Sequence, residues 1–148
     1  MSVVELRRRP LASPLDLIGA PYLRGGVTPE AGFDCYTLAA YVRWHWFTRP
    51  TPGGEIPSPQ LSCAQACARG IRRAFGGRHG ELSKWQACAP APGCIVALGR
   101  SRLSPLHHCG VWINGGVLHA FDRIGVAWTP GDRIGELFGR VEFYECRD

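Results

Sequence analysis

Apolar residues recur at helical spacing in the stretch after residue 34, and they are Leu38, Ala39, Val42 and Trp46. Asp34 stands directly upstream and has a side chain suited to an N-cap. The pattern predicts a helix from Cys35 to about Phe47 and places Cys35 in its first turn.

Strand patterns dominate the second half of the chain. The apolar run from Cys94 to Leu98 is bounded by glycines and predicts a buried central strand. Two more apolar runs meet at Asn114-Gly115-Gly116, which predicts a β-hairpin with a tight glycine turn. Further strands are expected at 124–128 and 140–146.

The middle of the chain is less regular. Residues 48–60 hold four prolines and Gly53-Gly54, which predicts a surface loop, and residues 62–75 then predict a second helix. Helices therefore come mainly before strands. We expect an α+β fold in which N-terminal helices pack on a small antiparallel sheet.

Composition fits one folded domain. The chain has 148 residues, 45% of them hydrophobic and 20% charged, which is typical of a single globular unit. We expect a catalytic domain over residues 15–148 and a basic arm over residues 1–14, which contain Arg7-Arg8-Arg9 and lack periodicity. No run of about 18 apolar residues predicts a membrane span, and no apolar segment behind the arginines predicts a secretory signal.

The net charge of +5 is compatible with an anionic polymer as partner, whether nucleic acid, cell-wall material or an acidic protein. The arginines are scattered over residues 7–9, 69–78 and 100–102, and no nucleic-acid motif accompanies them. We therefore favour solvated faces and expect no nucleic-acid partner.

Seven cysteines form an odd set, which argues for reduced thiols in a chain without a predicted signal peptide. Cys63, Cys67, Cys88 and Cys94 offer a possible zinc site. Their spacing departs from common zinc modules, so we expect no metal and no cofactor. Apart from Cys35, the cysteines are interpreted as small buried hydrophobes.

Cys35 is the candidate nucleophile. Backbone N–H groups and the positive end of the helix dipole favour a thiolate in the first turn of a helix, although a buried cysteine with no chemical role is the common alternative. His108 and His119 flank the hairpin turn and can lie side by side, one as base and the other orienting its ring. Strand alternation predicts that His107 faces away from them.

These pieces together resemble the NlpC/P60 cysteine peptidases of the papain-like superfamily. The resemblance covers residues 17–121, and it rests on Pro21-Tyr22, Gly25-Gly26, Gly32-Phe33-Asp34-Cys35, His108-Cys109-Gly110-Val111-Trp112 and Leu118-His119-Ala120. It implies that Cys35 is the nucleophile, His108 the base and His119 the third, orienting residue. It also implies a papain-like core and a Tyr22 hydroxyl close to the thiol, with Asp34 and Tyr36 as substrate-binding residues.

Two positions depart from the family pattern. Many members have Ser-Gly after Asp-Cys, where this chain has Tyr36-Thr37, and Gly93-Cys94 stands where the family often has Gly-Asp. An aromatic residue at the position of Tyr36 is frequent in members associated with phage tails.

The resemblance implies a cysteine peptidase or amidase that cleaves peptidoglycan stem peptides, at an amide of the D-glutamyl–diaminopimelate type. We expect a phage tail-tip component that acts on the host wall, assembled in the host cytoplasm with other tail-tip proteins as partners. The alternatives are a structural tail or adaptor module that keeps the fold without catalysis, and a thiol acyltransferase with the same first chemical step.

Overall fold

The computed structural model describes residues 11–51 and 85–146, and it has the expected α+β architecture. A six-stranded antiparallel sheet has the strand order β3-β8-β4-β5-β6-β7. Its strands are β3 (Trp85–Ala87), β4 (Ile95–Gly99), β5 (Leu106–Ile113), β6 (Gly116–Phe121), β7 (Gly125–Pro130) and β8 (Arg140–Cys146). The remaining elements are the 3-10 helix η1 (Pro14–Leu17), the short strands β1 (Val27–Thr28) and β2 (Gly32–Phe33), and the helices α2 (Cys35–Phe47) and α4 (Gly131–Leu137).

Helix α2 has the predicted start and the predicted end. Asp34 is the N-cap: its carboxylate accepts the Thr37 N–H at 2.8 Å, and the Thr37 hydroxyl oxygen accepts the Asp34 N–H at 3.0 Å. This reciprocal capping box satisfies two of the backbone donors that a helix start leaves without a carbonyl partner. At the other end, Thr48 adopts a left-handed conformation with φ of 53° and stops the helix.

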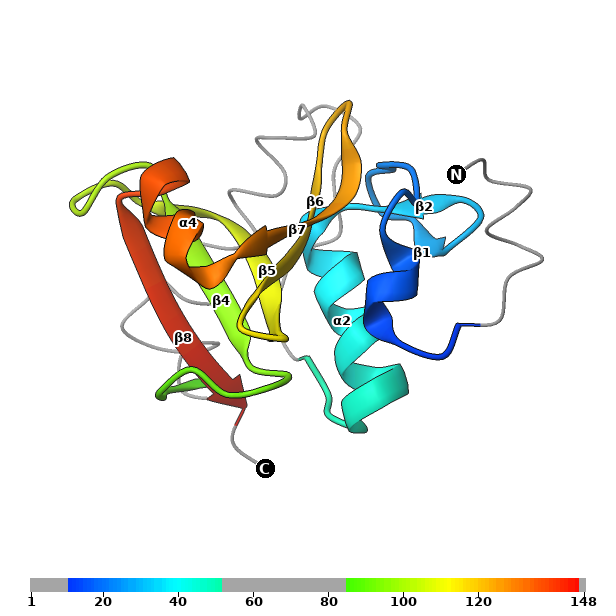
Figure 1. Cartoon of the computed structure of the whole chain (residues 1–148), viewed down its shortest axis with the longest axis horizontal. Helices are drawn as coiled ribbons and strands as arrows, with labels where there is room; N and C mark the ends of the chain where they lie inside the picture. The colour runs from blue at the N-terminus through cyan, green and yellow to red at the C-terminus, as the bar shows by residue number, and fades with distance from the viewer. Residues whose placement is uncertain (1–10, 52–84, 147–148) are drawn as a thin grey trace.

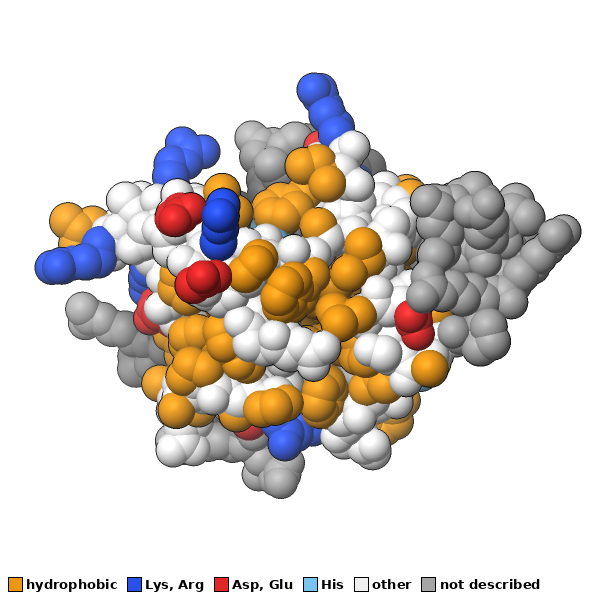
Figure 2. Space-filling view, in the orientation of Figure 1, with side chains coloured by type: hydrophobic (Ala, Val, Ile, Leu, Met, Phe, Trp, Pro, Cys, Tyr) orange, Lys and Arg blue, Asp and Glu red, His pale blue; other side chains and the backbone are white. Residues whose placement is uncertain are grey.

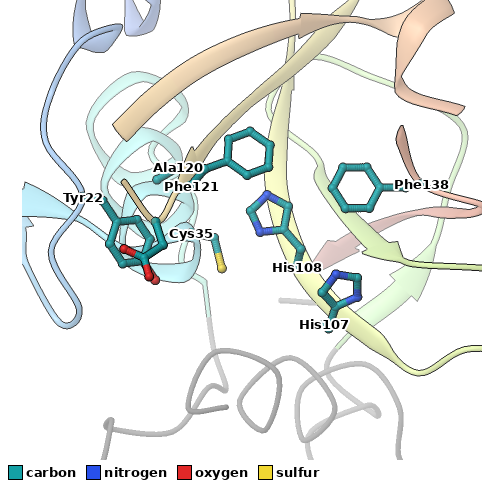
Figure 3. A pocket seen from close by; sticks show the side chains of 8 residues that line it. Tyr22, Cys35, His107, His108, Ala120, Phe121 and Phe138 are labelled. Atoms are coloured by element: carbon teal, nitrogen blue, oxygen red, sulfur yellow. The ribbon is translucent and has the colours of Figure 1, made fainter. Parts of the chain in front are cut away.

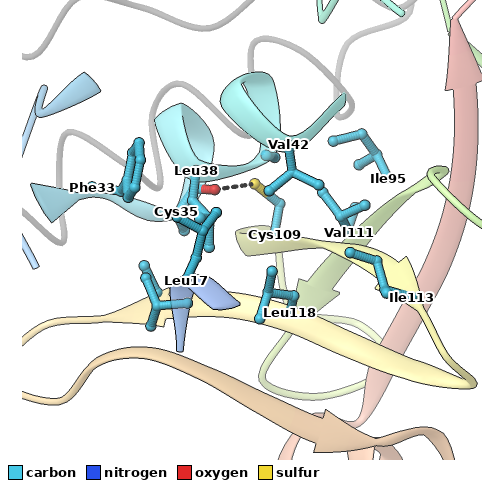
Figure 4. Close-up of a cluster of buried hydrophobic side chains, with 14 of the residues drawn as sticks. Leu17, Phe33, Cys35, Leu38, Val42, Ile95, Cys109, Val111, Ile113 and Leu118 are labelled. Atoms are coloured by element: carbon cyan, nitrogen blue, oxygen red, sulfur yellow. Dashed lines mark hydrogen bonds between the residues drawn. The ribbon is translucent and has the colours of Figure 1, made fainter. Parts of the chain in front are cut away.

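The sheet separates two hydrophobic clusters. Helix α2 packs against β5 and β6 on one face, and α4 lies against β6, β7 and β8 on the other (Figure 1). Between α2 and the sheet lie side chains that include Leu38, Val42, Val111 and Leu118 (Figure 4). The cluster under α4 is smaller and consists of Val96, Leu98, Val117, Ile134 and Phe138.

Arg43 anchors the far end of α2. Its side chain is fully buried, and its guanidinium donates to Glu145 at 2.7 Å and to the Gly93 carbonyl at 2.6 Å. The charge is therefore both paired and hydrogen bonded, as a buried cation must be. Since Glu145 belongs to β8, this contact links the helix to a strand that β4 separates from β5.

The expected strands are present, with small shifts of their ends. The run at 94–98 forms β4, the segment at 124–128 forms β7, and residues 140–146 form β8. The sequence did not predict β3 or α4. Helix α4 is short and holds Gly131 and Gly135 after Pro130, a composition that favours turns. The helix predicted at 62–75 and most of the loop predicted at 48–60 lie outside the described residues.

The hairpin turn is confirmed, and the two histidines that flank it lie side by side as expected. Asn114 and Gly115 both have positive φ, 51° and 73°, as a two-residue hairpin turn of type I′ requires. Val111 pairs with Leu118 across the turn, so continuing the register places His119 opposite Gly110 rather than opposite His108. The two histidines therefore share one face as diagonal neighbours.

The N-terminal segment is joined to β7. The 3-10 helix η1 is capped by Ser13, and Leu11 already packs against the core. After η1, Ala20 accepts the Val126 N–H at 2.9 Å. Gly125 allows this approach, because a Cβ there would lie 2.4 Å from the Ala20 carbonyl oxygen.

Among the residues that the structure describes, basic side chains do not gather on the face drawn in Figure 2. Hydrophobic side chains occupy its middle, and the Lys and Arg side chains stand apart from one another. None of the helices in the described ranges combines the length and the apolar composition needed to cross a membrane.

Candidate active site

Tyr22 lies beside the start of α2 because two distant segments pair. Tyr22 forms a parallel bridge with Phe33, and the Leu23 N–H donates to the Phe33 carbonyl at 3.0 Å. Gly32, with φ of 110°, makes room for this contact, since a Cβ there would lie 2.4 Å from the Pro21 carbonyl oxygen. The pairing carries the Tyr22 ring to the end of β2, two residues before Cys35.

Asp34 ties the glycine loop to the helix. One carboxylate oxygen accepts from Thr37 within the capping box, and the other accepts the Gly25 N–H at 2.8 Å. The side chain is 2% exposed. The Pro-Tyr, Gly-Gly and Asp-Cys segments of the sequence are thus parts of one hydrogen-bonded unit that positions Cys35.

Cys35 opens α2 and is held from the sheet side as well. The Cys109 thiol of β5 donates to the Cys35 backbone carbonyl at an S–O distance of 3.6 Å (Figure 4). This contact links the first turn of α2 to the strand that carries His108.

Cys35 and His108 line one cavity of about 180 Å³. The cavity is formed by Tyr22, Cys35, His107, His108, Ala120, Phe121, Asp122 and Phe138. Figure 3 shows the Cys35 sulfur and the His108 ring directed into it, with Tyr22 beyond the thiol. Three of the four predicted catalytic side chains therefore meet at the cavity wall.

The fourth, His119, lies behind His108. His108 Nε2 and His119 Nδ1 are 3.0 Å apart, so one ring donates a hydrogen bond to the other. Because this bond uses Nε2 of His108, Nδ1 is the ring atom left for the thiol. His119 makes a second hydrogen bond, because its Nε2 lies 2.8 Å from Oγ1 of Thr129 on β7.

Two phenylalanines fix the plane of the His108 ring. The ring stacks on Phe121, with centroids 4.9 Å apart, and on Phe138, with centroids 5.5 Å apart. Phe121 follows His119 by two positions on β6 and so faces the same side. These contacts leave His108 only 8% exposed.

Burial keeps both histidines neutral near neutral pH. Burial lowers the pKa of His108 well below its usual range, and the neighbouring rings of His119 and His107 lower it further. Burial also lowers the pKa of His119, to about 4. A neutral imidazole has a lone pair on one ring nitrogen, so His108 is able to accept a proton from the thiol.

The expectation that His107 faces away from the site is wrong. His107 lines the same cavity, at its lower edge in Figure 3. The cause is a β-bulge: Leu98 pairs with His108 but Gly99 pairs with Leu106, so His107 is an extra residue in β5. A bulge interrupts the alternation of side chains on which the expectation depended.

Tyr36 and Asp34, the predicted substrate-binding residues, are placed differently from the catalytic ones. Tyr36 lines a second cavity, of about 380 Å³, whose wall also includes Val27, Tyr41 and Trp44. The Asp34 carboxylate is engaged by the backbone of the loop and the helix. Substrate binding by either residue remains a prediction.

The zinc alternative falls largely outside the described residues, because Cys63 and Cys67 are not among them. Within residues 11–51 and 85–146, no three His, Cys, Asp or Glu side chains gather as metal ligands do. Cys88 and Cys94 contact each other, and burial raises the pKa of both thiols, that of Cys94 to about 11.

Sequence reasoning missed Phe121, Phe138 and Thr129. A period of two from His119 was the available signal for Phe121. Thr129 and Phe138 carry no such signal, because β7 and the segment after α4 reach the site only through the sheet topology.

No protein-family model matches this sequence, and no curated protein matches it either. Among solved structures, the NlpC/p60 domain of the peptidoglycan hydrolase SagA is similar, with a TM-score of 0.50 and 17% identity over 99% of this chain and 100% of that chain. A protein of Staphylococcus aureus subsp. aureus Mu50, described as similar to lipoprotein, NLP/P60 family, has a TM-score of 0.50 and 15% identity. That match covers 95% of this chain and 39% of the other. At these identities the likeness concerns the fold alone, and it confirms the expected α+β fold of NlpC/P60 domains.

Proposed function

We propose that the chain is a cysteine peptidase that cleaves peptidoglycan stem peptides. One observation carries the proposal: Cys35, at a capped helix start, shares a cavity with His108, and Nε2 of His108 is hydrogen bonded to His119. A nucleophile, a base and a group that orients the base are what amide cleavage by a thiol requires. The similar domain of SagA is described as part of a peptidoglycan hydrolase, which supports the substrate class.

In the proposed reaction, Sγ of Cys35 attacks the carbonyl carbon of the amide while His108 Nδ1 accepts the thiol proton. Backbone N–H groups at the start of α2 stabilise the oxyanion, because a helix start offers donors that no carbonyl of the helix accepts. The C–N bond then breaks as His108 returns the proton to the leaving amine nitrogen. Water, deprotonated by His108, hydrolyses the thioester and restores the thiol.

The experiment for the substrate class is digestion of purified muropeptides, followed by mass analysis of the products. We expect a stem peptide to be split at an amide of the D-glutamyl–diaminopimelate type, with one new carboxylate and one new amine. Cleavage of unrelated peptides but of no muropeptide would contradict the substrate class and leave the thiol chemistry in place.

The second candidate is a structural module that keeps the fold without catalysis. The geometry favours the enzyme. A structural role gives no reason to keep an imidazole stacked between two phenylalanines and joined to a second buried imidazole beside a thiol. Transfer of the acyl group to an amine is a third outcome, and the product masses of the same digestion distinguish it from hydrolysis.

The setting we propose is a phage tail tip, where the enzyme opens the host wall with other tail-tip proteins as partners. The aromatic residue at Tyr36 and the basic segment around Arg7-Arg8-Arg9 support this setting by resemblance. Mass spectrometry of purified phage particles that carry the gene tests it, and absence of the chain from intact particles would contradict it.

A further inference from the structure

A chain of three hydrogen-bonded side chains crosses three neighbouring strands. His108 on β5 contacts His119 on β6 through Nε2 and Nδ1 at 3.0 Å, and His119 Nε2 lies 2.8 Å from the Thr129 hydroxyl on β7. Val117 pairs with Thr129 across β6 and β7, which puts the threonine on the face that His119 shares. The site therefore extends one strand farther than its two histidines.

The contact between His119 and Thr129 affects which nitrogen of each histidine ring carries a proton. His119 is fully buried, and burial lowers its pKa to about 4, so at neutral pH its ring carries one proton. If the proton is on Nε2, then Nδ1 accepts from His108 Nε2–H, and His108 Nδ1 keeps a lone pair for the thiol proton. If the proton is on Nδ1, His119 donates to His108, and the proton of neutral His108 stands on Nδ1. That second arrangement blocks the base.

The charged intermediate decides between the two arrangements. Once His108 has taken the thiol proton, both of its ring nitrogens are donors, and Nε2–H needs an acceptor at His119 Nδ1. His119 must then hold its own proton on Nε2, which in turn needs an acceptor. The Thr129 oxygen is the atom at hydrogen-bond distance.

We propose that Thr129 is a positioning residue that accepts the Nε2–H of His119 and thereby keeps His108 in the tautomer that deprotonates Cys35. The inference rests on the proposed function, since it assigns a role within the same site. A threonine suits this role, because its hydroxyl oxygen accepts from His119 while the hydroxyl hydrogen is free to rotate away from the ring.

The variant that tests this is Thr129→Val, which removes the hydroxyl and keeps the branched shape that β-strands favour. Thr129→Ser retains the hydroxyl and is the matched rescue. Thr28→Val is a control for loss of a threonine outside the site, where the Thr28 hydroxyl accepts the Ala31 N–H. Thermal unfolding of each variant establishes that it is folded.

The first readout is the rate at which iodoacetamide alkylates Cys35 as a function of pH, which requires no peptidoglycan. Loss of a group that orients a functional histidine costs roughly 10- to 100-fold in metal sites, and we expect a decrease in that range for Thr129→Val at neutral pH. Thr129→Ser and Thr28→Val should be alkylated at nearly the rate of the unaltered chain, because both keep the hydroxyl that accepts from His119.

The second readout is the tautomer of His119, from the ¹⁵N shifts of its ring. We expect Nε2–H in the unaltered chain and in Thr129→Ser, and a mixture in Thr129→Val. With a cleaved muropeptide, Thr129→Val should lower kcat and leave KM nearly unchanged, because Thr129 does not line the cavity.

A folded Thr129→Val variant with unaltered alkylation rate and unaltered His119 tautomer would overturn the inference. So would Thr129→Ser slowed as much as Thr129→Val. If no muropeptide is cleaved but Thr129→Val still slows alkylation and shifts the tautomer, the proposed substrate is wrong and the role of Thr129 stands.

Discussion

His108 and His119 combine burial with a hydrogen bond to each other, and this gives the protein a characteristic dependence on pH. The pKa of each is lowered in the folded chain, to about 4 for His119, whereas an exposed histidine titrates near 6.5. Between these values the unfolded chain binds more protons than the folded one. The free energy of unfolding is therefore not reduced by these two histidines above about pH 6.5, and it decreases as the pH falls toward 4.

Replacement of His119 should reduce this dependence on pH. His119→Asn keeps a polar side chain but removes a titrating ring, so the fall in the free energy of unfolding between pH 6.5 and 4 should be smaller than in the unaltered chain. Each unit of pKa difference amounts to about 1.4 kcal/mol. Denaturant unfolding at several pH values measures the effect, and equal slopes for the two chains would contradict it.

The three histidines should differ in their effect on cleavage. His108→Ala removes the base and should lower kcat by about 10²- to 10⁴-fold, while His119→Ala should cost less, since an imperfectly oriented imidazole still accepts a proton. His107→Ala should cost less than about tenfold in kcat, because its ring packs near Phe138 and is no part of the His108–His119 chain. Steady-state kinetics on one muropeptide tests the order, and a silent His108→Ala would refute the assignment of the base.

Cys35 should be the most reactive thiol toward a small alkylating agent near pH 7. Its place at the start of α2 and its access to His108 favour the thiolate, whereas burial raises the pKa of Cys88 and of Cys94. Peptide mapping after substoichiometric iodoacetamide gives the order of labelling. Labelling of Cys88 or Cys94 before Cys35 in folded protein would be incompatible with this expectation.

At the scale of elements, β5 and β6 carry the site, and Gly110 sets how closely they approach. A Cβ at Gly110 would lie 2.5 Å from a methyl group of Val117, 2.7 Å from the Leu118 carbonyl oxygen and 3.0 Å from Cβ of His119. The glycine in the His-Cys-Gly segment is thus required by the close approach of β6, chiefly at Val117 and at the Leu118 carbonyl.

Gly110→Ala should therefore push β6 away from β5, carry His119 with it, and destabilise the fold by about 1–3 kcal/mol, the usual cost of overpacking. Cleavage by the folded fraction should also fall. Gly135→Ala in α4 is the matched control: nothing lies within 4 Å of the position that its methyl group would take, and alanine there should be neutral or stabilising by up to about 1 kcal/mol. Chemical denaturation and kinetics measure both, and a Gly110→Ala chain with native stability and activity would contradict this explanation.

The sequence predicted correctly those features that depend on neighbouring residues within one helix or turn. The helix from Cys35, its Asp34 cap and the tight turn at Asn114-Gly115 follow from local patterns. The place of His107 does not, because the bulge depends on how β4 pairs with β5. Helix α4 is held by packing of Ile134 on the sheet, which its glycine-rich sequence does not reveal.

At the scale of the whole molecule, the site is assembled from parts that are distant in sequence. Tyr22 and Cys35 come from the N-terminal half, the histidines from the hairpin of β5 and β6, and Thr129 and Phe138 from segments that follow this hairpin. Motif order was enough to relate Cys35, His108, His119 and Tyr22 to one another through the family resemblance. It gave no information on the side chains that hold His108 in place.

We propose that Cys35 is the nucleophile of a peptidoglycan peptidase. The most direct test is the cleavage rate of a defined muropeptide by the unaltered chain, by Cys35→Ala and by Cys88→Ala, a control that removes a half-buried thiol outside the cavity. We predict that Cys35→Ala loses cleavage to the limit of detection while Cys88→Ala keeps it. Cleavage by folded Cys35→Ala at the rate of the unaltered chain would contradict the account.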